Sequence, residues 1–350
     1  MLRRIWQILL AGLLFCLLIL WPGGQSIHAA VADPSSSAPL EPGAGLGLQK
    51  GPEVVKVGVY ITRLDNFNLN GKSFDATFWL WMISPEHDHN RLDDIEFVNA
   101  ENVEFTNSIS KVTPDGTWYQ RKVVATLHHD WNLRKFPFDR QDLHLKLEES
   151  DSYIDEVIYV PEDTKFLVDG HMKIKGWRVV SSKIRPSIKT YMTNFGDPGL
   201  RSDMPTSFSG FDIMVQIERT NFTAFWRFTA GAIVAAAIAL SSYAFHVDKA
   251  QTLSPRFALL SGAVFAAIIS LRSASTGLGI TDYNTLVDQI HLVSLVYVMI
   301  ATFAGVYTWS LYRRHEDGIA IERLGHRVAF VSTLLLVFVV AGLIRKAMFL

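Results

Sequence analysis

Residues 129–143 read HDWNLRKFPFDRQDL. The centre of this stretch is an aromatic–Pro–aromatic–Asp string formed by Phe136, Pro137, Phe138 and Asp139, and Gln141 follows two residues later. Short segments of alternating polarity lie on both sides of the stretch, and four long apolar runs follow it. The string alone is a moderately specific marker of a protein family. Together with this order of segments, it becomes a strong one.

The segments around this loop alternate between apolar and polar residues, as half-buried β-strands do. Val55, Val57, Val59 and Ile61 provide the first such run, and residues 74–82 provide a second. Further candidate strands lie at 102–111, 117–128, 142–148, 156–160, 172–183 and 211–219. Short strands at this spacing, without a helical period, predict a sandwich of two antiparallel sheets over residues 53–220.

Four apolar runs follow, at residues 222–245, 255–271, 287–311 and 328–344. A membrane-spanning helix needs ~20 largely apolar residues. The second run is short and rich in small and hydroxyl residues, which favours a helix lined by water and other helices. Residues 221–350 are therefore expected to form a four-helix transmembrane domain. With the sandwich outside, the charges obey the positive-inside rule modestly through Lys249, Arg256, Arg313, Arg314, Arg323 and Arg327.

Residues 1–32 have the layout of a secretory signal peptide. Basic residues precede an apolar run at 5–20, and an A-x-A-like site follows at 30–32. An uncleaved anchor is the alternative, and lipid attachment at Cys16 is a weaker one. Residues 33–52 are rich in Pro, Ser, Gly and Ala, which is typical of a disordered linker. Because Cys16 is the only cysteine, a cleaved chain would have neither disulfides nor thiolate chemistry.

Composition and motifs exclude several classes of function. The formal net charge of −1 leaves no basic stripe for a nucleic-acid partner. The chain has no G-x-S-x-G, H-E-x-x-H or phosphate-binding glycine motif, so we expect neither an enzyme nor a cofactor. His87 and His89 could begin a metal site, but no further ligand follows at a fixed spacing. A polar turn is therefore favoured there, and no metal site is predicted.

The 129–143 loop resembles the signature loop of the pentameric ligand-gated ion channels (the Cys-loop receptor family). The two flanking cysteines of the animal receptors are replaced by His129 and Leu143, as happens in bacterial members. The resemblance covers most of the mature chain, with further matches at 58–60 (GVY), 147–148 (LE), 176–177 (GW) and Arg219. It implies an extracytoplasmic all-β sandwich plus a four-helix transmembrane domain. It further implies a homopentamer in the bacterial inner (cell) membrane, in contact with membrane lipid, with the sandwich on the periplasmic or extracellular side.

Members of this family bind small-molecule ligands between subunits, so the resemblance points to several separate stretches. On one face these are residues 98–101, 149–153 and the hairpin 191–209, and on the other they are residues 79–81 and 118–119. Aromatic side chains there could surround a cationic amine. Alternatively, Trp79, Trp81 and Trp177 are sandwich core. The candidate ligand-binding residues are Trp79, Trp81, Glu101, Trp118, Tyr119, Glu149, Tyr153, Tyr191 and Phe195.

The resemblance also implies a coupling site where the sandwich meets the membrane domain. Asp139 is expected to pair with Arg219 there, beside Phe136, Pro137 and Phe138 of the signature loop. Relatives supply a further acid between the first two strands, where this chain has Asn68 with Asp65 nearby. We therefore expect a pair of charges rather than a triad.

By the same resemblance, the second apolar run lines the pore. When Arg256 is placed at the inner end, five residues follow at helical spacing on one face: Ala258, Gly262, Phe265, Ile269 and Arg272. Phe265 would form a central constriction that gates by dewetting, and Arg272 would lie near the outer mouth. No Glu precedes Arg256, which favours permeant anions or poor selectivity. A tight, non-conducting bundle is the alternative.

Two functions follow from these patterns. The first is a ligand-gated ion channel subunit that passes inorganic ions. The second is a non-conducting, membrane-bound ligand-binding sensor on the same scaffold. The apolar pore face favours the sensor, whereas the signature loop and Arg219 favour the channel, which is the main prediction.

Overall fold

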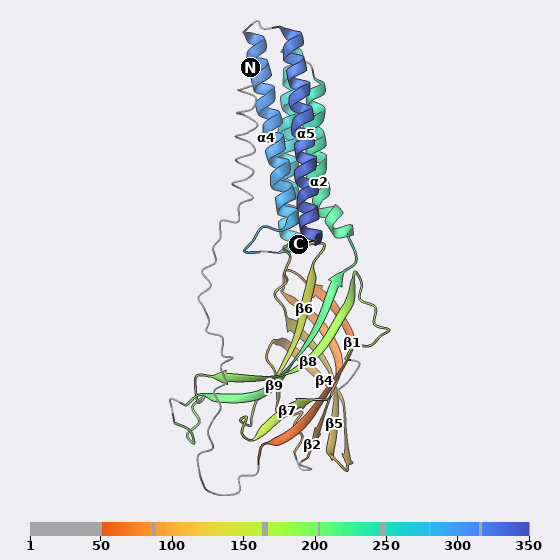
Figure 1. Cartoon of the computed structure of the whole chain (residues 1–350), viewed down its shortest axis with the longest axis vertical. Helices are drawn as coiled ribbons and strands as arrows, with labels where there is room; N and C mark the ends of the chain where they lie inside the picture. The colour runs from red at the N-terminus through yellow and green to blue at the C-terminus, as the bar shows by residue number, and fades with distance from the viewer. Residues whose placement is uncertain are drawn as a thin grey trace. The chain divides into compact units, whose positions relative to one another are not determined.

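The computed structural model describes residues 51–85, 89–162, 167–201, 204–245, 250–279, 281–314 and 317–349 (Figure 1). The expected signal peptide, Cys16, nearly all of the linker, His87 and Lys249 lie outside these described residues. The chain divides into two compact units. One contains residues 51–228, 272–287 and 346–350, and the other contains residues 229–271 and 288–345.

The first unit contains two β-sheets, as the alternating pattern predicts. One sheet has the order β4-β5-β2-β1-β7 and the other the order β3-β6-β9-β8. The described strands are β1 Glu53–Asn68, β2 Ser73–Ser84, β3 Ile95–Phe97, β4 Ala100–Thr113, β5 Gly116–His128, β6 Arg140–Glu149, β7 Val157–Pro161, β8 Trp177–Tyr191 and β9 Thr206–Arg219. Neighbouring strands pair antiparallel except β1 and β7, which are parallel.

The core of this unit lies between the two sheets, because apolar side chains at alternate positions point to the same side of each sheet. In β1 these are Val55, Val57, Val59 and Ile61, all fully buried. The second sheet buries Leu143, Leu145 and Leu147 of β6 and Phe211, Ile213, Val215 and Ile217 of β9. Within its sheet, β9 pairs with β6 on one side and β8 on the other.

The predicted bounds of β8 and β9 differ most from the structure, and β3 was not predicted. β9 begins at Thr206 instead of 211. β8 begins at Trp177 instead of 172, because the Trp177 N–H donates to the Ile174 carbonyl oxygen in a turn and Gly176 has a φ of 81°. It then continues to Tyr191, paired with β9 along an arm whose residues are mostly exposed. β3 has only three residues, too few for a visible period.

Four long helices follow in the sequence: α2 Thr223–Ser241, α3 Ala250–Leu278, α4 Leu286–Arg313 and α5 Gly318–Phe349, with a short 3-10 turn η1 at Ser242–Ala244. Each is long and apolar enough to cross a membrane. α3 is longer than the apolar run at 255–271, because polar residues such as Ser273, Ser275 and Thr276 lower the hydropathy without ending the helix.

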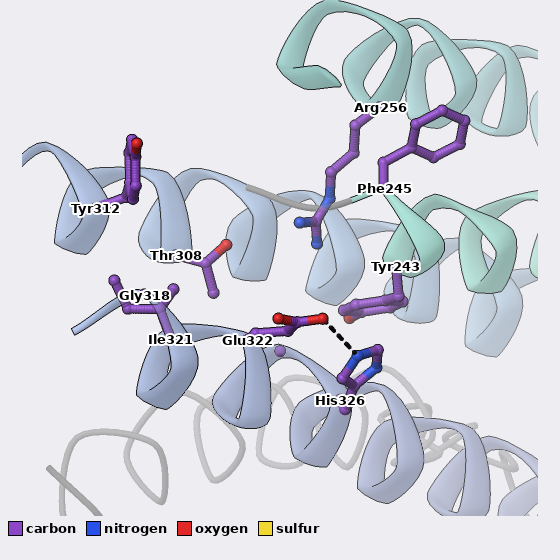
Figure 2. A pocket seen from close by; sticks show the side chains of 10 residues that line it. Tyr243, Phe245, Arg256, Thr308, Tyr312, Gly318, Ile321, Glu322 and His326 are labelled. Atoms are coloured by element: carbon purple, nitrogen blue, oxygen red, sulfur yellow. Dashed lines mark ion pairs between the residues drawn. The ribbon is translucent and has the colours of Figure 1, made fainter. Parts of the chain in front are cut away.

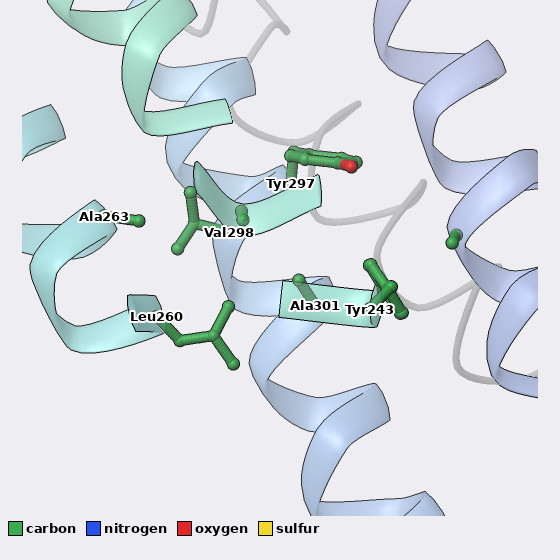
Figure 3. Close-up of a cluster of buried hydrophobic side chains, with 8 residues drawn as sticks. Tyr243, Leu260, Ala263, Tyr297, Val298 and Ala301 are labelled. Atoms are coloured by element: carbon green, nitrogen blue, oxygen red, sulfur yellow. The ribbon is translucent and has the colours of Figure 1, made fainter. Parts of the chain in front are cut away.

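The helical unit packs through small residues. Tyr243, Leu260, Tyr297 and Val298 form a buried cluster with several alanines, of which Figure 3 labels Ala263 and Ala301. Small side chains let helix backbones approach closely, which stabilises helix pairs in lipid. Gly231 of α2 illustrates this, because a Cβ there would overlap the Ser270 side chain of α3. Gly231 therefore allows close packing of α2 on α3.

Candidate functional site

The Asp139–Arg219 pair joins the start of β6 to the end of β9. Arg219 donates from Nε to Asp139 Oδ1 at 2.8 Å and from Nη2 to Oδ2 at 3.1 Å. Both side chains are largely buried, with 1% and 11% of their surfaces exposed for Asp139 and Arg219 respectively. Gln141 Nε2 also donates to Asp139 Oδ2, at 2.8 Å. The expected ion pair is therefore present, in bidentate geometry.

The further acid of this cluster is not Asp65. The Asp65 carboxylate pairs with Arg63 on the same strand. Asn68 uses its Oδ1 to accept a hydrogen bond from the Gly71 N–H at 2.8 Å. Among the described residues, the partners of Asp139 are therefore Arg219 and the neutral Gln141, which agrees with a pair rather than a triad.

Aromatic rings surround the Arg219 guanidinium. Its Cζ lies 4.0 Å from the ring centroid of Trp177 and 4.7 Å from that of Phe136. Phe136 is fully buried and its ring contacts Phe228 of α2 at 6.0 Å. Phe138 contacts Phe222, just before α2, at 5.5 Å. The signature loop, Pro137 included, thus lies in the same compact unit as the start of α2.

Tyr283, in the connection between α3 and α4, contacts the other end of the signature loop. Its hydroxyl accepts a hydrogen bond from the Leu133 N–H at 2.8 Å and donates to the Trp131 carbonyl oxygen at 3.2 Å. The Arg134 guanidinium lies 4.7 Å from the Tyr283 ring centroid. Tyr283 was not singled out from the sequence, because its partners lie about 150 positions away in the chain.

The connection between β1 and β2 contacts the same segment. Asn70 Nδ2 donates to the Thr276 carbonyl oxygen at 3.1 Å. A Cβ at Gly279, whose φ is 84°, would lie 2.8 Å from Asn70 Oδ1. Two loops of the sandwich therefore contact residues 272–287 within one compact unit.

The second group of predicted residues meets in an aromatic cluster on the β8–β9 arm. The Tyr191 ring lies 5.1 Å from Phe195 and 6.0 Å from Phe208, and the Tyr153 ring lies 5.3 Å from Phe208. Tyr153 also donates its hydroxyl proton to Asp197 Oδ2 at 2.8 Å. Phe208, which was not singled out from the sequence, is buried at the centre, whereas Phe195 is 62% exposed. This cluster could present aromatic faces to a cation.

Two buried carboxyl groups, those of Glu148 and Glu149, lie a few residues before Tyr153 in the sequence. Glu149 is 1% exposed and accepts hydrogen bonds from the Tyr159 hydroxyl and from the Asp151 and Ser152 N–H groups. Glu148 interacts with the Tyr191 hydroxyl. Burial raises the pKa of both carboxyl groups above the usual value. A nearby cation would favour their ionised forms.

The remaining ligand candidates lie on other surfaces of the sandwich. Trp79 and Trp81 are half-buried and point away from the buried Phe78 and Leu80, so they are not sandwich core, whereas Trp177 is buried. Trp81 Nε1 donates to Glu162 Oε2 at 2.8 Å.

The strand register separates Trp118 from Tyr119. Trp118 is opposite Ile83 and shares the face of Trp79 and Trp81, whereas Tyr119 is opposite Met82 on the other face. Glu101 is exposed near the start of β4. The chain therefore brings together Tyr153, Tyr191 and Phe195, but the aromatic cluster does not include Trp79, Trp81, Trp118, Tyr119 or Glu101.

The five spaced residues of α3 do share an exposed face. Ala258, Gly262, Phe265, Ile269 and Arg272 are all exposed in the single chain, Phe265 and Ile269 by 66%. Arg256, which was predicted as a pore residue at the inner end of this helix, does not share the exposed face. Arg256 is 3% exposed and lies on the buried face with Leu260 and Ala263. It precedes Ala258 by two residues, and about 100° per residue places the two on nearly opposite sides of the helix.

Within the described ranges, no group of three His, Cys, Asp or Glu side chains could hold a metal ion. His89 instead pairs with Asp94. Comparison with known protein families gave no match, and neither did comparison with curated proteins.

Proposed function

We propose that the chain is one subunit of a homopentameric ligand-gated ion channel in the bacterial cell membrane, with the sandwich outside. The main support is the coupling region, where Asp139 and Arg219 lie in one compact unit with the start of α2 and with Tyr283. The start of α2 and the connection between α3 and α4 both contact the 129–143 loop. Such an arrangement suits a protein in which movement of the sandwich changes the position of helix ends.

In this proposal, the ligand is a small cationic amine held at the aromatic cluster. Tyr191 and Phe195 offer exposed ring surface, and Glu148 becomes a counter-charge once it ionises. Trp79 and Trp81, on the outer face of the other sheet, suit the role of the adjoining subunit's contribution. A site between subunits would explain why one chain holds these residues apart.

The pore of the proposed channel is lined by the exposed face of α3. Ala258, Gly262, Phe265 and Ile269 give it an apolar wall. Five phenyl rings at one level exclude water until the helices move apart. A ring of Arg272 guanidinium groups above them enriches anions and repels cations. The proposed pore therefore passes anions in preference to cations.

Ion flux from proteoliposomes tests this function directly. Purified full-length protein in anionic-lipid vesicles should release chloride when an agonist from a panel of small amines is added. Native mass spectrometry of the same sample should give a pentamer. A monomer or dimer in mild detergent would contradict the proposed assembly.

A non-conducting sensor is the second candidate, and the apolar face around Phe265 favours it. The two functions separate in one experiment that combines amine binding by calorimetry with flux. Binding without flux, in both the native chain and Phe265→Ser, identifies the sensor. Flux that appears in Phe265→Ser identifies a channel with a closed hydrophobic gate.

A further inference from the structure

A cavity lies within the helical unit, at the end where α2 and α4 finish and α3 and α5 begin (Figure 2). Its walls include Tyr243, Arg256, Thr308, Glu322 and His326. All of these belong to the same compact unit. The cavity walls include no residue of the aromatic cluster, of the coupling region or of the exposed face of α3.

The side chain of Arg256 is unusual for its position. Arg256 is 3% exposed, and its Nε and Nη2 have no hydrogen-bond partner in the part of the chain that the structure describes. Its Cζ lies 5.2 Å from the Tyr243 ring centroid. A Cβ at Gly305 would lie 3.4 Å from Nε, so the glycine leaves the guanidinium room beside α4. A buried charge without a partner is strongly unfavourable, which implies that an anion completes this site.

A second donor lies beside the guanidinium. The Tyr243 hydroxyl also lacks a partner with hydrogen-bond geometry among the described residues. The neighbouring Ser332 uses its own proton to donate to the Ala329 carbonyl oxygen at 3.2 Å. Figure 2 shows Arg256 and Tyr243 extending into the same space from α3 and η1. The cavity therefore contains two side chains that can donate further hydrogen bonds. Phosphate oxygens are suitable acceptors for both.

Glu322 is the acidic residue in the cavity wall, and its Oε1 lies 3.6 Å from His326 Nε2 on the next turn of α5. The Arg256 Nε and Nη2 atoms donate no hydrogen bond to it. At the start of α5, Asp317 Oδ1 already accepts a hydrogen bond from the Ile319 N–H at 3.0 Å. The helix terminus is thus capped by the chain itself, and the unsatisfied positive charge is that of Arg256.

The surface around the cavity suits a lipid. Arginines 313, 314, 323 and 327 lie in the last turn of α4, just after it and in the first turns of α5. Farther along the same helices, large apolar side chains are exposed: Phe303 and Val306 on α4, and Phe330, Val331 and Leu334 on α5. Basic residues beside a lipid-facing apolar surface attract anionic headgroups.

We propose that this cavity binds the phosphate of an anionic membrane phospholipid. Arg256 and Tyr243 donate hydrogen bonds to the phosphate oxygens, and the acyl chains lie along the exposed apolar side chains of α4 and α5. The proposal requires membrane insertion, but it does not depend on ion conduction or on pentamer formation.

The test measures lipid binding to the full chain in detergent by native mass spectrometry and thermal unfolding. Phosphatidylglycerol should remain bound and raise the unfolding temperature more than phosphatidylcholine does. Arg256→Gln should weaken phosphatidylglycerol binding by roughly tenfold or more, because it removes a charge-assisted contact. Arg345→Gln, which changes an exposed arginine near the far end of α5 and outside the cavity wall, should have a much smaller effect.

A second variant guards against misfolding of Arg256→Gln. Tyr243→Phe keeps the ring under the guanidinium and removes only the hydroxyl, so it should fold and lose several-fold in phosphatidylglycerol affinity. Equal retention of both lipids by the native chain would overturn the proposal. Full competition by inorganic phosphate at millimolar concentration would also overturn it, because the site would then hold a free anion.

The chain's own acids provide the last control. Three variants each remove one carboxylate. Glu322→Gln changes the cavity wall itself, whereas Asp248→Asn and Glu316→Gln change residues that are close to cavity residues in the sequence. If one of them lowers stability as much as Arg256→Gln and abolishes the lipid preference, an internal ion pair replaces the lipid phosphate and the proposal fails. If all three keep the lipid preference, the external phosphate is supported.

Discussion

The guanidinium of Arg219 binds both carboxylate oxygens of Asp139, although the two residues are 80 positions apart in the sequence. Trp177 and Phe136 enclose the pair. When one partner is removed, water therefore cannot reach the remaining charge to hydrate it. This arrangement makes the pair sensitive to single substitutions.

Asp139→Ala and Arg219→Ala should each cost about 3–5 kcal/mol of stability or assembly, because each leaves an uncompensated buried charge. The double variant should lose little more than either single one. Urea unfolding of the purified protein measures all three. Arg140→Ala is the matched control, since its ion pair with Glu218 leaves Arg140 63% exposed and should be worth about 0–1 kcal/mol. Additive losses at Asp139 and Arg219 would show that the pair is not a unit.

Tyr283→Phe should reduce ligand-activated flux while amine binding stays unchanged. The variant keeps the ring beside Arg134 but leaves the Leu133 N–H without its acceptor, at a cost of about 1–3 kcal/mol. Dose–response curves of chloride release, compared with calorimetric binding, separate the two effects. Tyr60→Phe makes the same chemical change on β1 and should leave both curves in place. An equal loss of binding in Tyr283→Phe would contradict a coupling role.

Phe265→Ser should raise resting conductance or agonist sensitivity, because a hydroxyl at the constriction favours wetting. Val264→Ser and Ala266→Ser are the matched controls, since both residues are partly buried beside the exposed face. Single-channel recording in planar bilayers measures the effect. Opening by either control, with no change in Phe265→Ser, would mean that the pore face is assigned wrongly.

In the proposed pentameric pore, Arg272→Glu should shift the reversal potential toward cation permeability in asymmetric salt, because the proposed ring of guanidinium groups would become a ring of carboxylates. Arg227→Glu, a change at an exposed arginine of α2, serves as the comparison. An unchanged reversal potential in a conducting Arg272→Glu variant would place Arg272 outside the ion path.

Stability of the sandwich should fall as the pH drops below about 6.5. Burial lowers the pKa of His129, whose Nε2 is buried without a hydrogen-bond partner among the described residues. The unfolded chain therefore binds a proton near pH 6.5 that the folded chain binds only at lower pH, so stability is complete above pH 6.5 and is lost toward the folded pKa.

His129→Phe tests this pH dependence, because it keeps an aromatic ring beside Phe74 and Trp131 while removing the titrating group. Between pH 7.5 and pH 5, the unfolding temperature of this variant should change less than that of the native chain. These two pH values lie roughly one unit or more on either side of the ordinary histidine pKa. His128→Phe, at an exposed neighbour, is the comparison. If the unfolding temperatures of His129→Phe and of the native chain changed equally with pH, His129 would not be the source of the pH dependence.

Alternation identified the strands whose two faces differ in burial, such as β1 and β2. It found only the first part of β8, up to residue 183, because the residues of the outer half are exposed on both sides of the β8–β9 arm and show no period. At the coupling region, the resemblance located Asp139 and Arg219. It could not locate Tyr283, whose partner Leu133 lies 150 positions away and leaves no local pattern.

On α3, the spacing of four and three placed Phe265 and Ile269 on one face correctly. The resemblance placed Arg256 at the inner end of the helix, two residues before the face that begins at Ala258. The helical period of about 3.6 residues puts Arg256 on the other side of the helix, where it contacts Tyr243.

β9 carries Phe208 of the aromatic cluster and ends at Arg219. Eleven steps of an extended strand cover about 37 Å. Hydrogen bonds to both neighbouring strands stiffen this span, and Gly210 lets it pack where a Cβ would lie 2.5 Å from the Leu147 carbonyl oxygen. In the proposed channel, we expect such a strand to move as a rigid body. A small tilt at the end near Phe208 would then displace the residues that lead into α2 without separate side-chain rearrangements in between.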